Sequence, residues 1–247
     1  MTPDVVADVG NTRIKWGRCA PDGVVEAVSL PPDDTAAWDR QAEAWHLPRP
    51  AAWAGASVHP ARCARLAEWL RQRGDTVTVL TEAASLPLVV KVPNPDHVGI
   101  DRLLDAVAVN ALREPDRPAV VIDAGSAVTV DWLNEAGAFV GGAILPGLGL
   151  MAKSLHEHTA LLPLVEVPAQ RPAVPGTATA PAIEAGIFWA VAGGVRALVA
   201  AYAEAFDASP QLFLTGGDAP ALRSTLLAAH YSPFLTLDGI RLSVRGE

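Results

Sequence analysis

Two segments that share one residue pattern carry the groups best suited to bind phosphate. Asp8–Thr12 and Asp123–Ala127 each follow an apolar run. Each begins with Asp, a small apolar residue, Gly and a polar residue. Glycine lets the backbone turn tightly, so that peptide N–H groups can approach phosphate oxygens. A carboxylate beside a bound phosphate indicates a cation such as Mg²⁺ between them. Either copy alone is more typical of an ordinary β-turn, but two copies favour a duplicated unit with a ligand between the two turns.

Polar side chains around these segments extend the same chemistry. Lys15 could add positive charge beside the first turn, whereas Ser126 and Thr129 add hydroxyl groups and Asp131 a second carboxylate beside the second. Further along the chain, Thr215–Gly217 follows an apolar strand, and its paired glycines would let a flat ligand such as adenine approach the main chain. A structural strand-to-helix turn explains that last segment equally well.

Asp101 and Arg102 lie at the start of a predicted amphipathic helix over residues 101–113. The default role of Asp at such a position is to cap the helix, and on local grounds the cap is favoured. A substrate with both a hydroxyl and a carboxylate would instead be served by an Asp that takes the hydroxyl proton and an Arg that binds the acid. The pair therefore suits a hydroxy acid acceptor.

The elements expected around these residues alternate between strands and helices, which indicates an α/β fold. The charged, proline-bracketed segment 114–118 separates a first set of elements from a second, so we expect one lobe over residues 1–116 and another over residues 117–247. The expected strands lie near 5–7, 13–17, 24–29, 51–55, 76–80 and 119–122, continue through about Ile144, and end with a final strand near 212–214. A Gly-Pro segment is expected over 146–149, and helices near 35–46, 60–73, 101–113 and 179–206.

Composition and charge limit the partners. The 247-residue chain has a formal net charge of −8, so its long-range field repels nucleic acid. Cys19 and Cys63 lack the spacing of a disulfide framework or a zinc site. The first residues do not have the pattern of a signal peptide, and the apolar run 187–201 is shorter than the roughly 20 residues that span a bilayer. We therefore expect a cytoplasmic protein without a membrane partner.

The motifs, taken in order, resemble those of the type III pantothenate kinases, also called the Baf family, within the superfamily of acetate and sugar kinases, Hsp70 and actin. The resemblance covers the chain nearly end to end. The segments that carry it are Asp8–Lys15, Gly99–Arg102, Asp123–Asp131, Gly141–Gly147, Thr179–Gly186 and Thr215–Gly217.

This resemblance implies a fold, an activity and a set of site residues. The fold would be two similar ribonuclease H-like lobes, the actin-like ATPase fold, with the active site in the cleft between them. The activity would be ATP-dependent phosphorylation of pantothenate to 4'-phosphopantothenate, the first step of coenzyme A biosynthesis. Asp101 would accept the hydroxyl proton, Mg²⁺ would lie near Asp8, and K⁺ or NH₄⁺ near Asp123.

The resemblance also implies the binding residues. Thr179 would come from the partner subunit of a homodimer. The residues implied for pantothenate are Val92, Gly99, Ile100, Asp101, Arg102 and Thr179, and those implied for ATP are Asp8, Val9, Gly10, Asn11, Thr12, Arg13, Ile14, Lys15, Ser126, Thr215, Gly216 and Gly217.

The chain departs from the usual family pattern at two positions, with Ser126 where the family usually has Thr and Val92 where it often has an aromatic residue. Serine keeps the hydroxyl, whereas valine offers the pantothenate pocket neither a ring nor a phenol. Two alternatives stay open: a kinase of the same superfamily for another small hydroxy or carboxylic substrate, and an inactive regulatory or accessory member of the Baf family.

Overall fold

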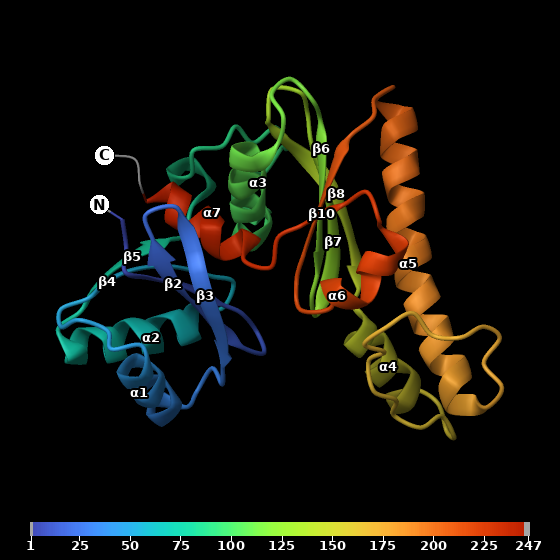
Figure 1. Ribbon diagram of the computed structural model, residues 1–247, viewed down its shortest axis with the longest axis horizontal. Helices are drawn as coiled ribbons and strands as arrows, with labels where there is room; N and C mark the ends of the chain where they lie inside the picture. The colour runs from blue at the N-terminus through green and yellow to red at the C-terminus, as the bar shows by residue number, and fades with distance from the viewer. Residues whose placement is uncertain (1, 245–247) are drawn as a thin grey trace. The chain divides into compact units, whose positions relative to one another are not determined.

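The chain folds into two compact units, shown in Figure 1. The structure is a computed structural model that describes residues 2–244, so the outermost residues of the two expected lobes, Met1 and 245–247, lie outside it. The first unit comprises the described parts of Met1–Leu112 and Phe234–Glu247, and the second comprises Arg113–Pro233. The chain thus changes unit next to the expected linker 114–118 and returns to the first unit at its end.

The first unit is built on a five-stranded mixed sheet in the order β3-β2-β1-β4-β5. Strands β1, β2 and β3 form an antiparallel meander, and β4 and β5 continue the sheet parallel to β1. The strands are β1 (Val5–Val9), β2 (Ile14–Ala20), β3 (Gly23–Leu30), β4 (Ala52–Ser57) and β5 (Thr76–Leu80).

Helices cover this sheet, and local signals set their ends. Asp34 accepts a hydrogen bond of 2.9 Å from the backbone N–H of Ala37 and so caps α1. Gly74, in the left-handed region at φ 81°, ends α2. The helices are α1 (Thr35–Ala44), α2 (Pro60–Arg73), α3 (Ile100–Leu112) and α7 (Leu235–Ser243), with 3₁₀ turns at Ala83–Ser85 and Pro95–His97.

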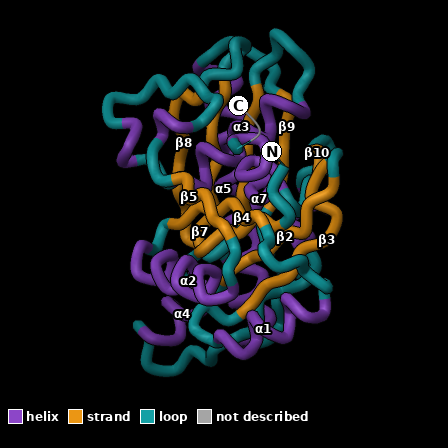
Figure 2. The backbone as a smooth tube through the Cα atoms, turned by 90° about the vertical axis from the view of Figure 1, so that its left-hand side faces the viewer, coloured by secondary structure: helices purple, strands orange, loops and turns teal. Residues whose placement is uncertain are grey.

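A cluster of tryptophans forms the core between the first sheet and helices α1 and α2. The two helices lie side by side in Figures 1 and 2. The aromatic members of the cluster are Trp16, Trp38, Trp45, Trp53 and Trp69. Because side chains alternate along a strand, Val5, Ala7 and Val9 face this core, whereas Val6 and Asp8 face the other side, where α7 packs against β1. The acid is thus kept out of the apolar core.

Helix α7 packs on the first unit, although the expected second lobe of residues 117–247 includes it. A Cβ on Gly239 would lie 2.1 Å from the carbonyl oxygen of Leu104, so α7 and α3 cross in backbone contact. Leu235, Leu237 and Ile240 are buried. The sequence shows that this segment has an apolar face, but only the tertiary fold decides which surface that face covers.

The second unit repeats the topology of the first. Its sheet has the order β10-β9-β6-β7-β8, in which β8, β7 and β6 are antiparallel neighbours and β9 and β10 continue parallel to β6. The strands are β6 (Ala119–Ala124), β7 (Ala127–Leu133), β8 (Phe139–Pro146), β9 (Gln211–Thr215) and β10 (His230–Tyr231). The α/β class and the duplication expected from the two acidic turns are confirmed, but β9 is not the last strand.

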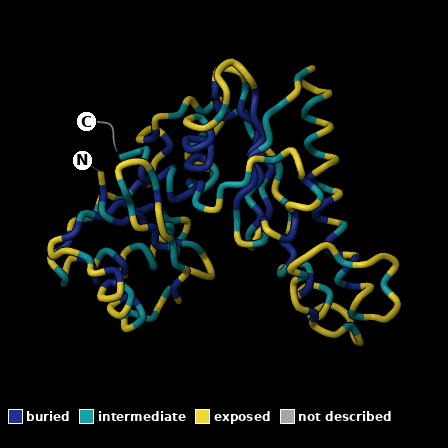
Figure 3. The backbone as a smooth tube through the Cα atoms, viewed as in Figure 1, coloured by how far each residue is buried: buried dark blue, intermediate teal, exposed yellow. Residues whose placement is uncertain are grey.

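Helix α5 (Thr179–Ala205) supplies much of the core of the second unit, together with α4 (Leu148–Glu157) and α6 (Ala219–Leu222). A 3₁₀ turn at Arg223–Thr225 follows α6. By length and composition alone, α5 could cross a membrane, because it has 27 residues and its most apolar window has a mean hydropathy of 1.5. The apolar run expected from the sequence, 187–201, is shorter than this helix. Phe188, Val191 and Val195 of α5, however, belong to the core that residues of β6 and β7 share. In Figure 3 the buried colour is found mainly in the strands, whereas much of α5 is intermediate or exposed. These three residues form one buried face of α5, as in a helix that packs on a sheet.

Candidate active site

The first acidic turn is a tight four-residue connection between β1 and β2. Val9 pairs with Ile14, and the N–H of Gly10 donates to the carbonyl of Arg13 at 3.0 Å. A Cβ on Gly10 would lie 3.2 Å from that carbonyl oxygen, so a larger residue would strain the turn. Asn11 and Thr12 are exposed at its tip. Asp8 lies directly opposite Lys15 in the strand register, so the acid and the base share one face of the sheet.

Asp101 sits inside the first turn of α3 and does not form the expected cap. The N–H groups of Arg102 and Leu103 donate to the carbonyl of Gly99, which makes Gly99 the residue before the helix. The Asp101 carboxylate accepts a hydrogen bond from the backbone N–H of Arg102 at 2.9 Å through Oδ1. A Cβ on Gly99 would lie 2.6 Å from that oxygen. Glycine at this position therefore leaves the space that the carboxylate fills.

Asp8 and Asp101 act on each other electrostatically. Burial raises the pKa of the Asp8 carboxyl from 3.8 to about 6, the positive charge of Lys15 lowers it, and the negative charge of Asp101 raises it again. A carboxyl whose charged form is disfavoured in this way is suited to a bound cation, which would offset both the burial and the repulsion. The structure thus brings together the first turn and the Gly99–Arg102 segment within one unit.

The second acidic turn has a polar face of its own. Asp123 pairs with Thr129 on β7 and with Thr215 on β9, so the three side chains project from neighbouring strands on the face opposite the apolar core. Ser126 is exposed at the tip of the turn. The chain delivers a carboxylate and hydroxyl groups to the same edge of the second sheet.

Thr215–Gly217 folds closely over the end of β6. Gly216 has φ +100°, and a Cβ there would lie 2.3 Å from the carbonyl oxygen of Ala124 and 2.4 Å from Oδ1 of Asp123. The N–H of Asp218 donates to the same carbonyl at 2.8 Å. Burial raises the pKa of the Asp218 carboxyl. The segment expected to bind adenosine and the second turn therefore lie side by side in this unit.

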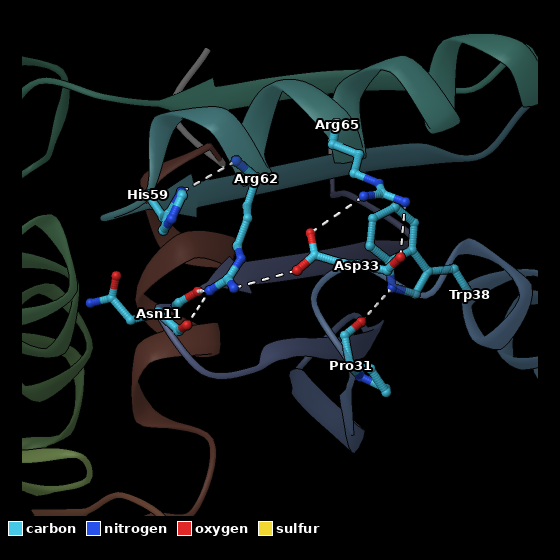
Figure 4. Close-up of polar contacts among 8 residues, drawn as sticks. Asn11, Pro31, Asp33, Trp38, His59, Arg62 and Arg65 are labelled. Carbon is cyan, nitrogen blue, oxygen red and sulfur yellow. Dashed lines mark hydrogen bonds and ion pairs between the residues drawn. The ribbon is translucent and has the colours of Figure 1, made fainter. Parts of the chain in front are cut away.

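Several residues that support these turns were not assigned a role from the sequence. The N–H of Gly147 donates to the carbonyl of Ser126 at 3.1 Å, and a Cβ on Gly147 would lie 2.2 Å from the carbonyl oxygen of Gly125. In the first unit, Ser57 and Arg62 bond to the backbone of the turn, and Figure 4 shows the contact of Arg62 with Asn11. The sequence Pro146–Gly147 indicates a turn at the Gly147 contact. No local pattern indicates that Arg62 contacts the first turn.

Thr179 and Val92, two further predicted site residues, belong to different units. Thr179 is the first residue of α5, is exposed, and borders an open apolar cavity of about 1170 Å³ between α4 and α5. Among the described residues, those that line this cavity include none of the other predicted site residues. Val92 is half-buried in the loop before α3.

Across residues 2–244, no group of three or more His, Cys, Asp or Glu side chains is arranged to hold a metal ion by itself. Mg²⁺ in nucleotide sites is usually held by one or two carboxylates, with phosphates and water completing its shell. Asp8 with Asp101 nearby fits that pattern, since its carboxyl is destabilised in the charged form.

Solved structures share the fold. A protein of Campylobacter jejuni described as a Baf family transcriptional activator superposes with a TM-score of 0.62 at 21% identity, covering 98% of this chain and 97% of that one. The activator of 2-hydroxyisocaproyl-CoA dehydratase from Clostridium difficile, with bound ADPNP, gives a TM-score of 0.53 at 14% identity, covering 98% and 93%. At such identities the likeness concerns the fold alone. The duplicated sheets, each with an acidic turn, define the actin-like ATPase fold.

Sequence similarity specifies the family within that class. The family model of the type III pantothenate kinases matches residues 5–201. A type III pantothenate kinase of Synechococcus sp. (strain JA-2-3B'a(2-13)) is 35% identical over 242 residues, covering 96% of this chain and 86% of the relative. The chain belongs to the type III pantothenate kinase family. It is therefore an ATP-dependent phosphotransferase, and the family uses a divalent metal with the nucleotide.

Proposed function

We propose that this protein transfers the γ-phosphoryl group of ATP to the primary hydroxyl of pantothenate in the cytoplasm, giving 4'-phosphopantothenate for coenzyme A biosynthesis. The observation that carries the proposal is the Gly99–Arg102 segment, where a carboxylate and a guanidinium begin one helix close to Asp8. Pantothenate offers both a hydroxyl to phosphorylate and a carboxylate to hold. A hexose offers no carboxylate to Arg102, and acetate offers no hydroxyl to Asp101.

Asp101 is the group that we assign to the hydroxyl. Its Oδ1 is engaged by the N–H of Arg102, which fixes the orientation of the carboxylate, and Oδ2 is the atom that accepts the proton as the hydroxyl attacks. Arg102 and the first turn of α3 hold the substrate carboxylate. Val92, Gly99 and Ile100 complete this side of the pocket. Catalysis then rests on positioning and charge neutralisation, as is general for phosphoryl transfer.

The nucleotide side is assigned to the two turns. Asp8–Lys15 and Ser126 would bind the phosphates, and Thr215–Gly217 the adenosine. Asp8 would hold Mg²⁺, which supplies charge neutralisation on the phosphates when it is bound. The raised pKa of the Asp8 carboxyl supports this assignment, because a cation would restore the charged form.

A monovalent cation, K⁺ or NH₄⁺, is assigned to Asp123. The residues present fit such an ion, since the Asp123 carboxylate and the carbonyl oxygen of Ala124 both lie against Gly216 and are therefore close to each other. Oxygen atoms are the ligands that hard cations prefer. The ion would offset negative charge beside the second turn.

We further propose that the active form is a homodimer in which Thr179 contacts pantothenate bound by the partner subunit. The exposure of Thr179 at the rim of the apolar cavity between α4 and α5 supports this, because a second copy would cover apolar surface there. Leu150, on the same cavity wall, is 52% exposed.

The variant Asp101→Asn tests the proposal. We expect turnover, measured as ADP release with ATP, Mg²⁺, K⁺ and pantothenate, to fall at least ~10²-fold while affinity for a non-hydrolysable ATP analogue is kept. Asp96→Asn is the matched control, since Asp96 is an exposed acid in the 3₁₀ turn before α3 and has no assigned role. Near-normal turnover in Asp101→Asn would remove its assignment as the base. Preference for a hexose, or no phosphorylated pantothenate from the unaltered protein, would overturn the proposed substrate.

A further inference from the structure

Three consecutive backbone carbonyls of the first turn are held by side chains from the β4–α2 corner. The hydroxyl of Ser57 donates to the carbonyl of Val9 at 3.1 Å. The guanidinium of Arg62 donates through Nη1 to the carbonyls of Gly10, at 3.4 Å, and of Asn11. Figure 4 shows Arg62 reaching from α2 to Asn11. The carbonyls of Gly10 and Asn11 therefore point toward α2, and that of Val9 points toward the end of β4.

The fold explains why Arg62 reaches this turn. Strands β1 and β4 are parallel neighbours, and Val9 pairs with Ser57, so the chain enters α2 beside the end of β1. Arg62 lies in the first turn of α2, after the cap His59, and side chains on a helix lean toward its N-terminus. A cation is electrostatically unfavourable at this end of a helix. The contacts of Arg62 with the Gly10 and Asn11 carbonyls and with the Asp33 carboxylate offset this unfavourable charge.

The direction of the carbonyls determines the direction of the N–H groups. In a trans peptide, the C=O of one residue and the N–H of the next point opposite ways. With the Gly10 and Asn11 carbonyls turned to α2, the N–H groups of Asn11 and Thr12 point away from it, into the exposed tip. The N–H of Gly10 closes the turn by donating to Arg13. Two adjacent N–H groups are thereby presented together, which is the arrangement that binds anions.

We propose that Arg62 is a positioning residue for nucleotide binding, which orients the N–H groups of Asn11 and Thr12 toward the phosphates of ATP. Asp33 sets the direction of the guanidinium, since its Oδ2 lies 3.4 Å from Arg62 Nη2. The second turn is held differently, because the carbonyl of Ser126 accepts from the backbone N–H of Gly147. In the first unit a side chain performs what the main chain performs in the second. The inference rests on the proposed role of the first turn in binding ATP.

Binding of a non-hydrolysable ATP analogue with Mg²⁺, measured by calorimetry on the full chain, tests this role without an acceptor substrate. We expect Arg62→Ala to weaken binding roughly ten- to a hundredfold, as misplacement of binding groups does, and Arg62→Lys to lie between it and the unaltered protein. Arg71→Ala is the control, because Arg71 lies on the same helix, is exposed, and pairs with Glu68. In steady-state assays the KM for ATP should rise while the KM for pantothenate stays unchanged.

Asp33→Asn separates positioning from simple charge. Removal of a negative charge near the turn should by itself tighten the binding of an anionic nucleotide. If Asp33 instead orients Arg62, the variant binds more weakly, and the analogue no longer shifts the amide signals of Asn11 and Thr12 in nitrogen-15 NMR spectra as it does in the unaltered protein. This test also serves if Arg62→Ala fails to fold.

The outcomes distinguish this inference from the proposed function. Unchanged analogue affinity in both Arg62 variants, or tighter binding by Asp33→Asn, overturns the positioning role whatever the acceptor is. Weaker binding by these variants in a protein that leaves pantothenate unmodified supports Arg62 and removes only the proposed substrate.

Discussion

Replacement of Asp8 by Asn removes a carboxyl whose charge the folded protein resists. Burial raises the pKa of this group from 3.8 to about 6, with Lys15 lowering it and Asp101 raising it again. The native state therefore binds the proton more tightly than the unfolded chain does. The stabilisation due to this proton is complete below pH 3.8 and is lost as the pH rises through about 6. Near neutral pH the charged carboxyl lowers the free energy of unfolding.

The size of this effect follows from the shift. Each pKa unit corresponds to about 1.4 kcal/mol, so a shift of about two units gives a ceiling near 3 kcal/mol. Asp8 keeps some exposed surface, which relieves part of the penalty. We expect Asp8→Asn to raise the free energy of unfolding by about 1 to 3 kcal/mol near pH 7, and to have little effect below about pH 4.

Urea titrations of both proteins between about pH 4 and pH 8 would measure this difference. Asp22→Asn is the control, because Asp22 is an exposed acid on the β2–β3 turn. Saturating Mg²⁺ and ATP analogue should remove the advantage of Asp8→Asn, since a cation would stabilise the charged carboxyl of the unaltered protein. A variant less stable than the unaltered protein near pH 7, or a difference that does not change with pH, would refute the reasoning.

Two further experiments test the second unit and the dimer. Gly216→Ala should lower the free energy of unfolding by about 2 kcal/mol or more and abolish any K⁺ dependence of turnover, because its Cβ would meet Ala124 and Asp123 oxygens at positive φ. Gly217→Ala, with nothing within 4 Å, should change stability little, and equal losses in both variants would contradict the crowding argument. If sites are shared between subunits, an equal mixture of Asp101→Asn and Thr179→Ala proteins should recover activity after subunit exchange, and a mixture as inactive as its components would exclude a shared site.

Local sequence predicted those elements whose signals are local. The helix Pro60–Arg73 and the strand Thr76–Leu80 have the expected bounds, since proline and glycine mark the ends of the helix and β-branched residues fill the strand. Helix α4 was not expected from the sequence, and it begins within the Gly-Pro segment 146–149, whose residue types are typical of turns. Strand β10 has two residues, too short a run for alternation to be recognised.

The candidate site likewise contains residues that local patterns reveal and residues that they do not reveal. The acidic turns were found because their residue types and their repetition are visible in the chain. Asp101 was expected to cap α3, whereas it lies within the first turn and bonds to the N–H of Arg102, a difference of register that local patterns do not resolve. Arg62 was missed, because its contacts with Gly10 and Asn11 join residues about fifty positions apart.

The sequence by itself determined the class of fold, the duplication and the family, because these depend on periodicity and on motifs of adjacent residues. Only the tertiary structure decided that α7 returns to the first unit, that Gly216 makes room for Asp123, and that Arg62 turns the carbonyls of the first turn. The physical reason is that close approach and hydrogen-bond direction depend on which strands become neighbours, and strand pairing joins segments that are distant along the chain.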